Sequence, residues 1–378
     1  MASMTHRERV LRALKHQEPD RVPLDLGGSR SSSLVVEAYE RLSRHLGSQE
    51  PPRIFSKWLN VAHPSEAMLT RFDIDTRSLS QGDPDNWHDI IFPDGSYQDE
   101  WGVVRSKPAG CLYYDLTKAP LAGDADVADL KKFRWPDPHD PGRCRRLADA
   151  AARLHQGTDH AVVLSMPGGI VHQAQFMRGL EDWFADLIAN PAFFQALMEK
   201  LADLWIGMAK DELDAVGNNV DVCFLGDDMA FQNGPMMSMD LYRKLIKPHH
   251  KRLFSYIKSR TSAKIAYHTC GSVVHLIPDL IEMGVDALNP VQVSAKGMDT
   301  ERLKQEFGQD ICFWGAIDTQ RVLPFGEPED TAREVKGRID DLCPGGGYIL
   351  CAVHNIQADV SPENICAMYD TAREYGRY

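Results

Sequence analysis

The segment Lys264 to Ser272, with the sequence KIAYHTCGS, contains two residues of metal-binding types, His268 and Cys270. Its apolar, β-branched and aromatic residues are typical of a strand. Side chains two positions apart on a strand project to the same face, so the imidazole and the thiol would converge at one end of it. Histidine nitrogen and cysteine thiolate together suit Zn²⁺. Gly271 would then let the backbone turn away from the strand.

A structural role is the alternative for this pair. The pattern is short, and taken alone it is more often a buried thiol beside a hydrogen-bonded core histidine. Two ligands do not hold a metal, so the zinc interpretation requires further ligands from elsewhere in the chain.

Eight segments have the apolar character of buried strands, and most are separated by helical patterns. They are 21–28, 74–79, 161–166, 220–225, 264–270, 287–290, 311–315 and 348–353. Eight parallel strands alternating with helices predict an α/β fold, the (β/α)8 TIM barrel. An N-terminal amphipathic helix over 5–17 precedes the first strand, and we expect it to form a lid or plug outside the main fold. Longer helices are expected over 177–189, 191–216 and 238–261.

This alternation is interrupted between Trp87 and Lys118. Pro-Asp-Gly turns and short β-rich pieces there predict an antiparallel β-hairpin insertion over 87–118. The glycine pairs and runs at 168–169 and 345–347 have no flanking lysine of a phosphate loop, so we predict turns. We expect residues 1–378 to form a single barrel domain, with Met1 to Ser3 as a remnant outside the fold.

Polar residues concentrate where the predicted strands end, which is where the active sites of such barrels lie. Asp227 and Asp228 follow the strand 220–225 and would point to opposite sides if the strand continues. One would face the cavity as a catalytic acid, a metal ligand or a partner of His268, and the other would pair or cap locally. Candidates for substrate binding, with turn formation as the alternative role, are Asp25, Gln232, Asn289, Gln292, Asn355 and Gln357.

The composition argues against several classes of protein. A formal net charge of −12 disfavours nucleic acids and anionic membranes as partners, since both require a basic face. No run of 18 apolar residues and no apolar segment of an export signal is present. The eight cysteines lack the spacing of a disulfide framework, which indicates reduced thiols. We therefore expect a cytoplasmic protein.

Five stretches resemble the uroporphyrinogen decarboxylase superfamily, and together they run nearly from end to end: HRERVLRALKHQEPDRVPLD, GDDMAFQNGP, HTCG, MGVDALNPVQ and HNIQADVSPEN. The resemblance implies one of two activities, a decarboxylation without cofactor or a zinc-dependent methyl transfer that involves a corrinoid protein. The methyltransferase branch has His-x-Cys at the position of His268 and Cys270. The Arg-Gln-Ala-Gly-Arg-like run of the decarboxylases is not present, and Arg30 matches it only weakly.

The resemblance also implies a third zinc ligand, usually cysteine, at the end of the last strand. Counting back from Pro362, the matching position holds His354. Cys351 lies three residues earlier, or ~10 Å along an extended strand. We predict His354 as the third ligand and keep Cys351 as the alternative, because all ligands must lie within ~2.0–2.3 Å of one metal.

The function predicted from the sequence is a zinc-dependent methyltransferase. A small methyl ether, amine or thiol would be the methyl donor, and a corrinoid (cobalamin) on a separate partner protein would be the acceptor. Two alternatives remain open: a cofactor-free decarboxylase of the uroporphyrinogen type, and a non-catalytic barrel that binds a tetrapyrrole or another small ligand. Whether the chain forms a homodimer is also left open.

Overall fold

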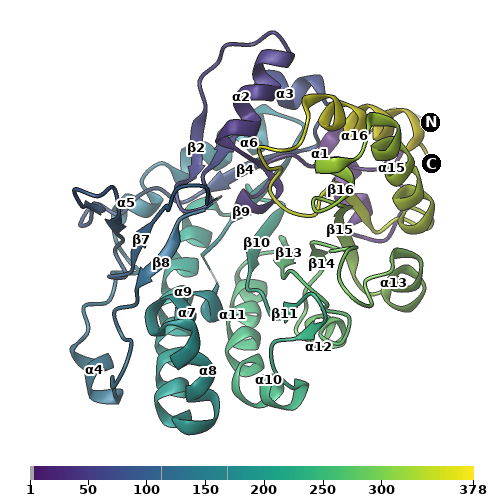
Figure 1. The fold of residues 1–378 in the computed structure, drawn as a ribbon. Helices are drawn as coiled ribbons and strands as arrows, with labels where there is room; N and C mark the ends of the chain where they lie inside the picture. Colours follow the sequence, from purple (N-terminus) through teal and green to yellow (C-terminus); the bar gives the residue numbers. More distant parts are fainter. Residues whose placement is uncertain (1–3, 112, 168) are drawn as a thin grey trace.

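The computed structural model describes residues 4–111, 113–167 and 169–378, so the predictions for Met1–Ser3 and Gly168 lie outside it. Seven parallel strands form a curled central sheet in the order β16-β15-β14-β13-β10-β9-β4, with helices on its outside (Figure 1). The strands are β4 Thr76–Ser80, β9 Ala161–Ser165, β10 Val222–Gly226, β13 Lys264–His268, β14 Ala287–Asn289, β15 Cys312–Ile317 and β16 Tyr348–Ala352. Seven of the eight predicted strands are therefore present.

The segment predicted as the first strand, 21–28, is not a regular strand, but it closes the sheet. Leu24 forms a parallel bridge with Leu350 of β16, and its carbonyl accepts a hydrogen bond from the amide of Asp75, beside β4 (2.9 Å). The two edges of the sheet are thus joined into a barrel. Pairing stays short because Pro23 has no amide hydrogen and the Leu24 amide donates to the Asp75 carboxylate instead (2.7 Å).

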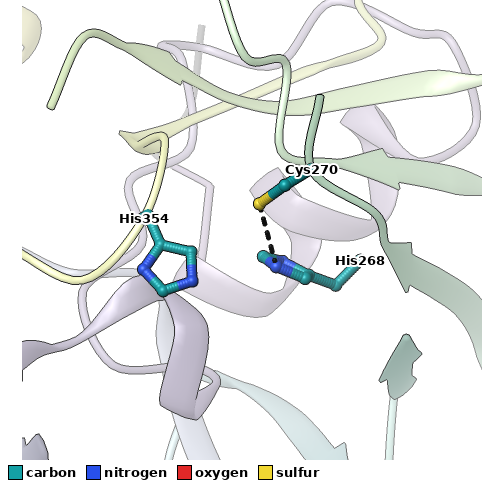
Figure 2. Close-up of side chains that lie close together, drawn as sticks. All are labelled: His268, Cys270 and His354. Carbon is teal, nitrogen blue, oxygen red and sulfur yellow. Dashed lines mark hydrogen bonds between the residues drawn. The ribbon is translucent and has the colours of Figure 1, made fainter. Parts of the chain in front are cut away.

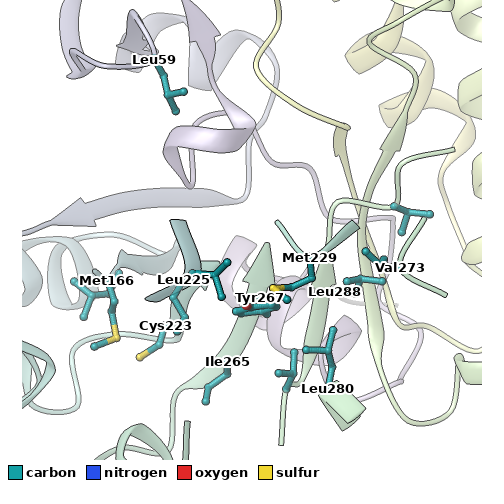
Figure 3. Close-up of a cluster of buried hydrophobic side chains, with 14 of the residues drawn as sticks. Leu59, Met166, Cys223, Leu225, Met229, Ile265, Tyr267, Val273, Leu280 and Leu288 are labelled. Carbon is teal, nitrogen blue, oxygen red and sulfur yellow. The ribbon is translucent and has the colours of Figure 1, made fainter. Parts of the chain in front are cut away.

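Two apolar layers hold the barrel together. Successive strand residues point to opposite faces, so Leu225 enters the layer between sheet and helices, while Phe224 enters the barrel interior. Figure 3 shows part of the outer layer, including Ile265, Tyr267 and Leu288. The interior layer includes Val10, Ala13 and Leu14, which belong to or follow helix α1 (His6–Ala13). The N-terminal helix is therefore a plug, one of the two roles predicted for it, but it packs into the barrel interior and does not lie outside the main fold as predicted.

A buried cluster of charges fastens this plug to the barrel. The fully buried carboxylate of Asp75 accepts hydrogen bonds from Arg9 (2.5 Å) and Arg21 (2.7 Å), and it lies 2.7 Å from Nδ1 of His6. Burial alone would raise the pKa of Asp75, but these partners outweigh it and lower the pKa. The Asp75 carboxylate is therefore ionised, and Arg9, Arg21 and His6 all contact it.

The insertion forms a four-stranded antiparallel sheet in the order β5-β6-β7-β8, at the left of Figure 1. Its strands are β5 Ile90–Ile91, β6 Tyr97–Gln98, β7 Val104–Ser106 and β8 Asp115–Lys118. The antiparallel pairing agrees with the sequence prediction, but the insertion contains more than one hairpin.

The helix predicted over 191–216 is present as α9 (Pro191–Val216), but the helices predicted over 177–189 and 238–261 are each broken, which corrects those two predictions. The range 177–189 covers the end of α7 (Ile170–Arg178) and α8 (Leu180–Ala189), which Gly179 separates with a φ of +84°. The range 238–261 divides into α10 (Met239–Leu245) and α11 (Lys247–Arg260), because Pro248 in the first turn of α11 has no amide to continue α10. The other main helices are α2 Val36–His45, α3 Glu66–Arg71, α6 Leu147–Gly157, α12 Ile277–Glu282, α13 Thr300–Phe307, α15 Pro328–Leu342 and α16 Pro362–Tyr375.

Smaller elements complete the fold. A three-stranded sheet and a two-stranded hairpin contain β1 Leu34–Val35, β2 Arg53–Ser56, β3 Val61–His63, β11 Ala230–Phe231 and β12 Gly234–Pro235. Short helices are α4 Val127–Lys132, α5 Pro141–Cys144, α14 Val322–Phe325 and the 3₁₀ turn Arg30–Ser32. Within the described ranges, no helix combines the length and apolar character needed to cross a membrane.

Candidate metal centre

The carboxyl ends of β13 and β16 bring together the three residues predicted to bind zinc. One nitrogen of His268, one nitrogen of His354 and the Cys270 sulfur all lie within 4.8 Å of one another. Figure 2 shows the His354 ring facing the other two side chains, with Cys270 Sγ 3.4 Å from His268 Nε2. Small side-chain movements would let two nitrogens and one sulfur reach a single ion. The donor set and its spacing therefore fit a catalytic zinc site with three protein ligands.

The alternative ligand Cys351 lies elsewhere. It is fully buried in the interior layer, and its thiol donates to the Ala352 carbonyl (3.1 Å). His354 follows β16 by two residues and is half-buried, with its ring centroid 5.6 Å from that of His268. Between the two predicted alternatives, the geometry favours His354.

A hydrogen-bonding chain fixes the tautomer of His268. The Asn289 amide nitrogen donates to the Trp314 carbonyl (3.1 Å), which leaves its Oδ1 as an acceptor 2.6 Å from His268 Nδ1. We infer that Nδ1 carries the hydrogen, so that the lone pair of Nε2 faces Cys270. This is the arrangement found for metal-ligating histidines, whose other ring nitrogen is held by a neighbouring acceptor.

Two glycines make room for the site. Gly226 pairs with His268 across β10 and β13, and a Cβ on it would lie 2.3 Å from the His268 carbonyl oxygen. Gly271 has a φ of +94°, and a Cβ there would lie 2.6 Å from the Ala230 carbonyl oxygen. Gln292 holds this turn by accepting a hydrogen bond from the Gly271 amide (2.6 Å). The chain can therefore turn sharply just after Cys270.

The adjacent carboxylates, which follow the end of β10 at Gly226, point in different directions. Asp227 is fully buried; it accepts a hydrogen bond from the His172 amide (2.7 Å) and lies 3.1 Å from Nε2 of His250 on α11. Asp228 accepts from the Cys270 amide (2.8 Å) and lies 3.9 Å from His268 Nε2. Asp228 is therefore the carboxylate that faces the site, and Asp227 ties the strand end to surrounding helices.

His172, near the start of α7, is a site residue that the sequence analysis missed. Its Nε2 lies 3.6 Å from Asp228 Oδ2, and its Nδ1 lies 3.7 Å from Asp227 Oδ1. Burial alone would lower the pKa of His172, but the two carboxylates outweigh it and raise the pKa. Burial alone would raise the pKa of Asp228, but His172 and His268 outweigh it and lower the pKa. The only sequence signal was that His172 follows a predicted barrel strand.

The three candidate ligands differ in their protonation without a metal. Burial lowers the pKa of His268 and lowers that of His354 to about 4, so both imidazoles are neutral at pH 7. Burial, with Asp228 nearby, raises the pKa of Cys270 well above its usual value. A cation at this position would be needed to hold the thiolate form.

The predicted substrate-binding residues fall into two groups. Asn289 and Gln292 support the ligands as described, and Asn355 and Gln357 lie in the loop after β16 beside His354. Asn355 is buried and donates to the Arg30 carbonyl, while its own Oδ1 has no partner in the described residues. The Oδ1 of Asn355 and the Oε1 of Gln357 are thus free acceptors next to the site.

Asp25 and Gln232 do not join the cluster. Both oxygens of Asp25 are occupied, by the Thr76 hydroxyl (2.5 Å), the Gly28 amide (2.8 Å) and the Trp314 indole (2.9 Å). Asp25 therefore holds the segment that closes the barrel. Gln232 is exposed in the β11–β12 hairpin.

Comparisons with known proteins agree with this architecture. The family model described as uroporphyrinogen decarboxylase (URO-D) matches residues 117–375. A methylcobamide:CoM methyltransferase, MtbA, from Methanosarcina mazei is 23% identical over 379 aligned positions, which cover 99% of each chain. A uroporphyrinogen decarboxylase from Bacillus pumilus is 25% identical over 190 positions, covering 50% of this chain and 49% of that protein.

A solved structure gives the same result for the fold. It is that of a methyltransferase from Methanosarcina mazei, with a TM-score of 0.68 and 19% sequence identity. The match covers 98% of this chain and 99% of the other. The two chains therefore share one fold over their whole length.

Proposed function

Because this chain belongs to the uroporphyrinogen decarboxylase family, we propose that it is the zinc-dependent methyltransferase type of member rather than a decarboxylase. The reaction would move a methyl group between a small methylated molecule and a corrinoid carried by a separate protein. The observation that carries this proposal is the convergence of His268, Cys270 and His354 within 4.8 Å. The similarity to MtbA over nearly the full chain supports the same branch.

His268, Cys270 and His354 are the residues that would hold the zinc. When bound at such a site, zinc acts as a Lewis acid on a methyl-bearing oxygen or stabilises a thiolate at neutral pH. Neutral imidazoles and a thiol that releases its proton on metal binding are suited to this role. Asn289 would keep His268 in the required tautomer through its 2.6 Å contact with Nδ1.

Asp228 and His172 are the proposed proton-handling pair. Asp228 accepts from the Cys270 amide and so keeps one carboxylate oxygen next to the ligands, while its other oxygen faces His172 Nε2 (3.6 Å). In this arrangement Asp228 and His172 would share a proton, which the pair supplies to or takes up from the leaving atom of the substrate. Asp227 positions His172 from the other side, through its backbone amide.

Decarboxylation is the second candidate, because two uroporphyrinogen decarboxylases match parts of the chain. One of these matches covers 50% of the chain. In that reaction the same acid–base groups would protonate the carbon that loses carbon dioxide. Bound metal is then not expected to affect turnover, which gives a clear distinction between the two candidates.

The test combines metal content with two assays. We expect protein purified without chelators to contain about one zinc per chain, as three closely spaced ligands predict. With reduced cobalamin as acceptor, methoxylated aromatics, methylamines and methyl thiols are supplied in turn, and methyl-cobalt formation is followed by absorbance. Metal-free protein that releases carbon dioxide from a carboxylated tetrapyrrole and forms no methyl-cobalt would overturn the proposal.

A further inference from the structure

The antiparallel insertion is packed against the mouth of the barrel through a buried cation. The guanidinium of Arg105, on β7, lies over the ring of Phe176 on α7 (4.1 Å to the centroid) and over Trp58 (5.1 Å). Arg105 is buried, and Phe176 in turn stacks on His172 (6.0 Å between centroids). Cation–π contacts of a desolvated arginine are among the stronger of their kind. The insertion is therefore fixed to the helix that carries His172.

This packing carries the residues just before β8 to the candidate metal centre. The Tyr114 amide donates to the Trp58 carbonyl (3.1 Å), and the preceding residue, Tyr113, extends towards the loop after β16. The Tyr113 ring packs edge-on against His354, with centroids 6.4 Å apart. Its hydroxyl lies 2.7 Å from the Gln357 amide nitrogen. Tyr113 thus touches two residues of the site although it belongs to the insertion.

Whether the Tyr113 hydroxyl donates or accepts its hydrogen bond with Gln357 follows from the other contact of the Gln357 amide. Its amide nitrogen has two hydrogens and two neighbouring acceptors, the Asn355 carbonyl (3.1 Å) and the Tyr113 oxygen (2.7 Å). Turning the amide over would place two oxygens against each other at Asn355, so Gln357 is the donor to Tyr113. The Tyr113 hydroxyl therefore accepts this bond and keeps its own hydrogen for another acceptor.

No acceptor for that hydrogen is recorded among the described residues. A phenolic hydroxyl has an ordinary pKa of about 10, so the Tyr113 hydroxyl is protonated at neutral pH. A protonated donor with an unused hydrogen beside His354 is a group placed for a ligand.

We infer that Tyr113 is a substrate-contacting residue, and that its hydroxyl donates a hydrogen bond to the atom that bears the methyl group. This inference deepens the proposed function, on which it rests for its activity measurement. A neutral ether oxygen or thioether sulfur accepts such a bond, and the bond strengthens as that atom gains negative charge. A methylated ammonium nitrogen has no free lone pair for it. The substrate class is therefore a neutral methyl ether or thioether.

A pair of probes of nearly the same shape tests the contact without turnover. Methoxybenzene has an ether oxygen where ethylbenzene has a methylene group. We expect zinc-loaded protein to bind methoxybenzene about 5–10-fold more tightly in calorimetric or NMR titrations, the size of one hydrogen bond. In Tyr113→Phe, which keeps the ring against His354, the ratio of the two dissociation constants should fall to about one.

A neighbouring tyrosine supplies the matched control. The Tyr114 ring packs against Tyr97 within the insertion (5.2 Å), so Tyr114→Phe removes a hydroxyl next in sequence but outside the site. That variant should keep the wild-type ratio. A second variant, Gln357→Glu, offers Tyr113 an acceptor of its own and should reduce the ratio as Tyr113→Phe does. Zinc content should be unchanged in all three.

The results separate this inference from the proposed function. A Tyr113→Phe protein with the wild-type ratio, or wild-type protein that binds neither probe, would overturn the role of Tyr113. If the ratio of the two dissociation constants changes as expected but no methylated donor gives methyl-cobalt, the proposed methyl transfer is wrong and the role of Tyr113 as a ligand contact is kept. If both hold, Tyr113→Phe should slow methyl transfer from methoxylated donors by about tenfold.

Discussion

The two ends of the barrel each bury a cluster of ionisable residues, but the clusters are completed in different ways. At the plugged end, the Asp75 carboxylate is matched by Arg9, Arg21 and His6. At the open end, His268, Cys270 and His354 stand within 4.8 Å of one another, and the described residues include no cation between them. One cluster is satisfied by the protein alone, whereas the donors of the other would be matched by the zinc that we propose.

This difference separates a structural cluster from a functional one. Asp75 is fully buried and His354 is half-buried, so burial of polar groups does not by itself mark a site. The open end also has polar atoms without a partner among the described residues, the Oε1 of Gln357 and the hydroxyl hydrogen of Tyr113. Substitutions at the two ends should accordingly change different quantities.

The largest effect is expected from loss of a metal ligand. His268→Ala or His354→Ala should strip the zinc and reduce methyl transfer by at least ~10³-fold, because a site with three protein ligands has no spare donor. Elemental analysis and the methyl-cobalt assay measure the two effects, and the melting temperature of the metal-free protein serves as the fold control. Cys351→Ser is the matched variant at the alternative ligand, and zinc loss there with retention in His354→Ala would reverse the assignment.

The second effect concerns the plugged end. Asp75→Asn leaves Arg9 and Arg21 buried without their counter-charge, and breaking such a buried pair costs ~3–5 kcal/mol of stability. Urea denaturation should show this loss, while the zinc content of the folded protein stays the same. Loss of zinc from folded Asp75→Asn would mean that the two ends of the barrel are coupled, and it would contradict a purely structural role for the Asp75 cluster.

A smaller effect is expected from the residue that orients His268. Asn289→Leu removes the acceptor at Nδ1 without touching the three ligands, and changes of this kind weaken metal binding by ~10–100-fold. Competition with a chelating dye measures the affinity. An affinity equal to that of the wild type would show that the tautomer is set in another way.

The smallest effect is a difference in acid sensitivity between the two ends of the metal-free protein. His354 has a pKa of about 4 in the fold against an ordinary 6.5, so its contribution to stability is complete above pH 6.5 and is lost as the pH falls from 6.5 to about 4. Asp75 has a pKa below its ordinary 3.8, so its contribution is lost only below that pH.

Variants separate these two windows. His354→Gln should flatten the dependence of the melting temperature on pH between 6.5 and 4, and Asp75→Asn should flatten it only at lower pH. The groups facing His354 are His268, His172 and Asp228, and those facing Asp75 are His6, Arg9 and Arg21. If His354→Gln flattened the curve only at the lower pH and Asp75→Asn flattened it between pH 6.5 and 4, the directions of both pKa shifts would be contradicted.

Much of this organisation was predictable from the sequence, for reasons that particular residues illustrate. Side-chain alternation predicted that His268 and Cys270 lie together and that Asp227 and Asp228 diverge. Both placements are observed, although β13 ends at His268 and β10 ends at Gly226. The position of His354 needed the family resemblance. The first strand was overpredicted because its apolar residues do not reveal that Pro23 and the Asp75 carboxylate interrupt the pairing.

The residues that were missed depend on packing between distant parts of the chain. His172 lies in a helix that the periodicity placed too late, since Gly179 divides α7 from α8. Tyr113 reaches His354 from the insertion, which Arg105 packs against Phe176. Neither contact leaves a local pattern of residue types, so neither could be predicted from a single sequence.

The short bridge between Leu24 and Leu350 also has a consequence for biosynthesis. On the ribosome, Leu24 emerges early, and its partner in β16 emerges only when most of the chain has been made. Until then the nascent sheet ends at β15, whose outer edge has no neighbour and is open to pairing with other chains. A stalled chain that stops before residue 348 should therefore aggregate more readily than one that has passed residue 352.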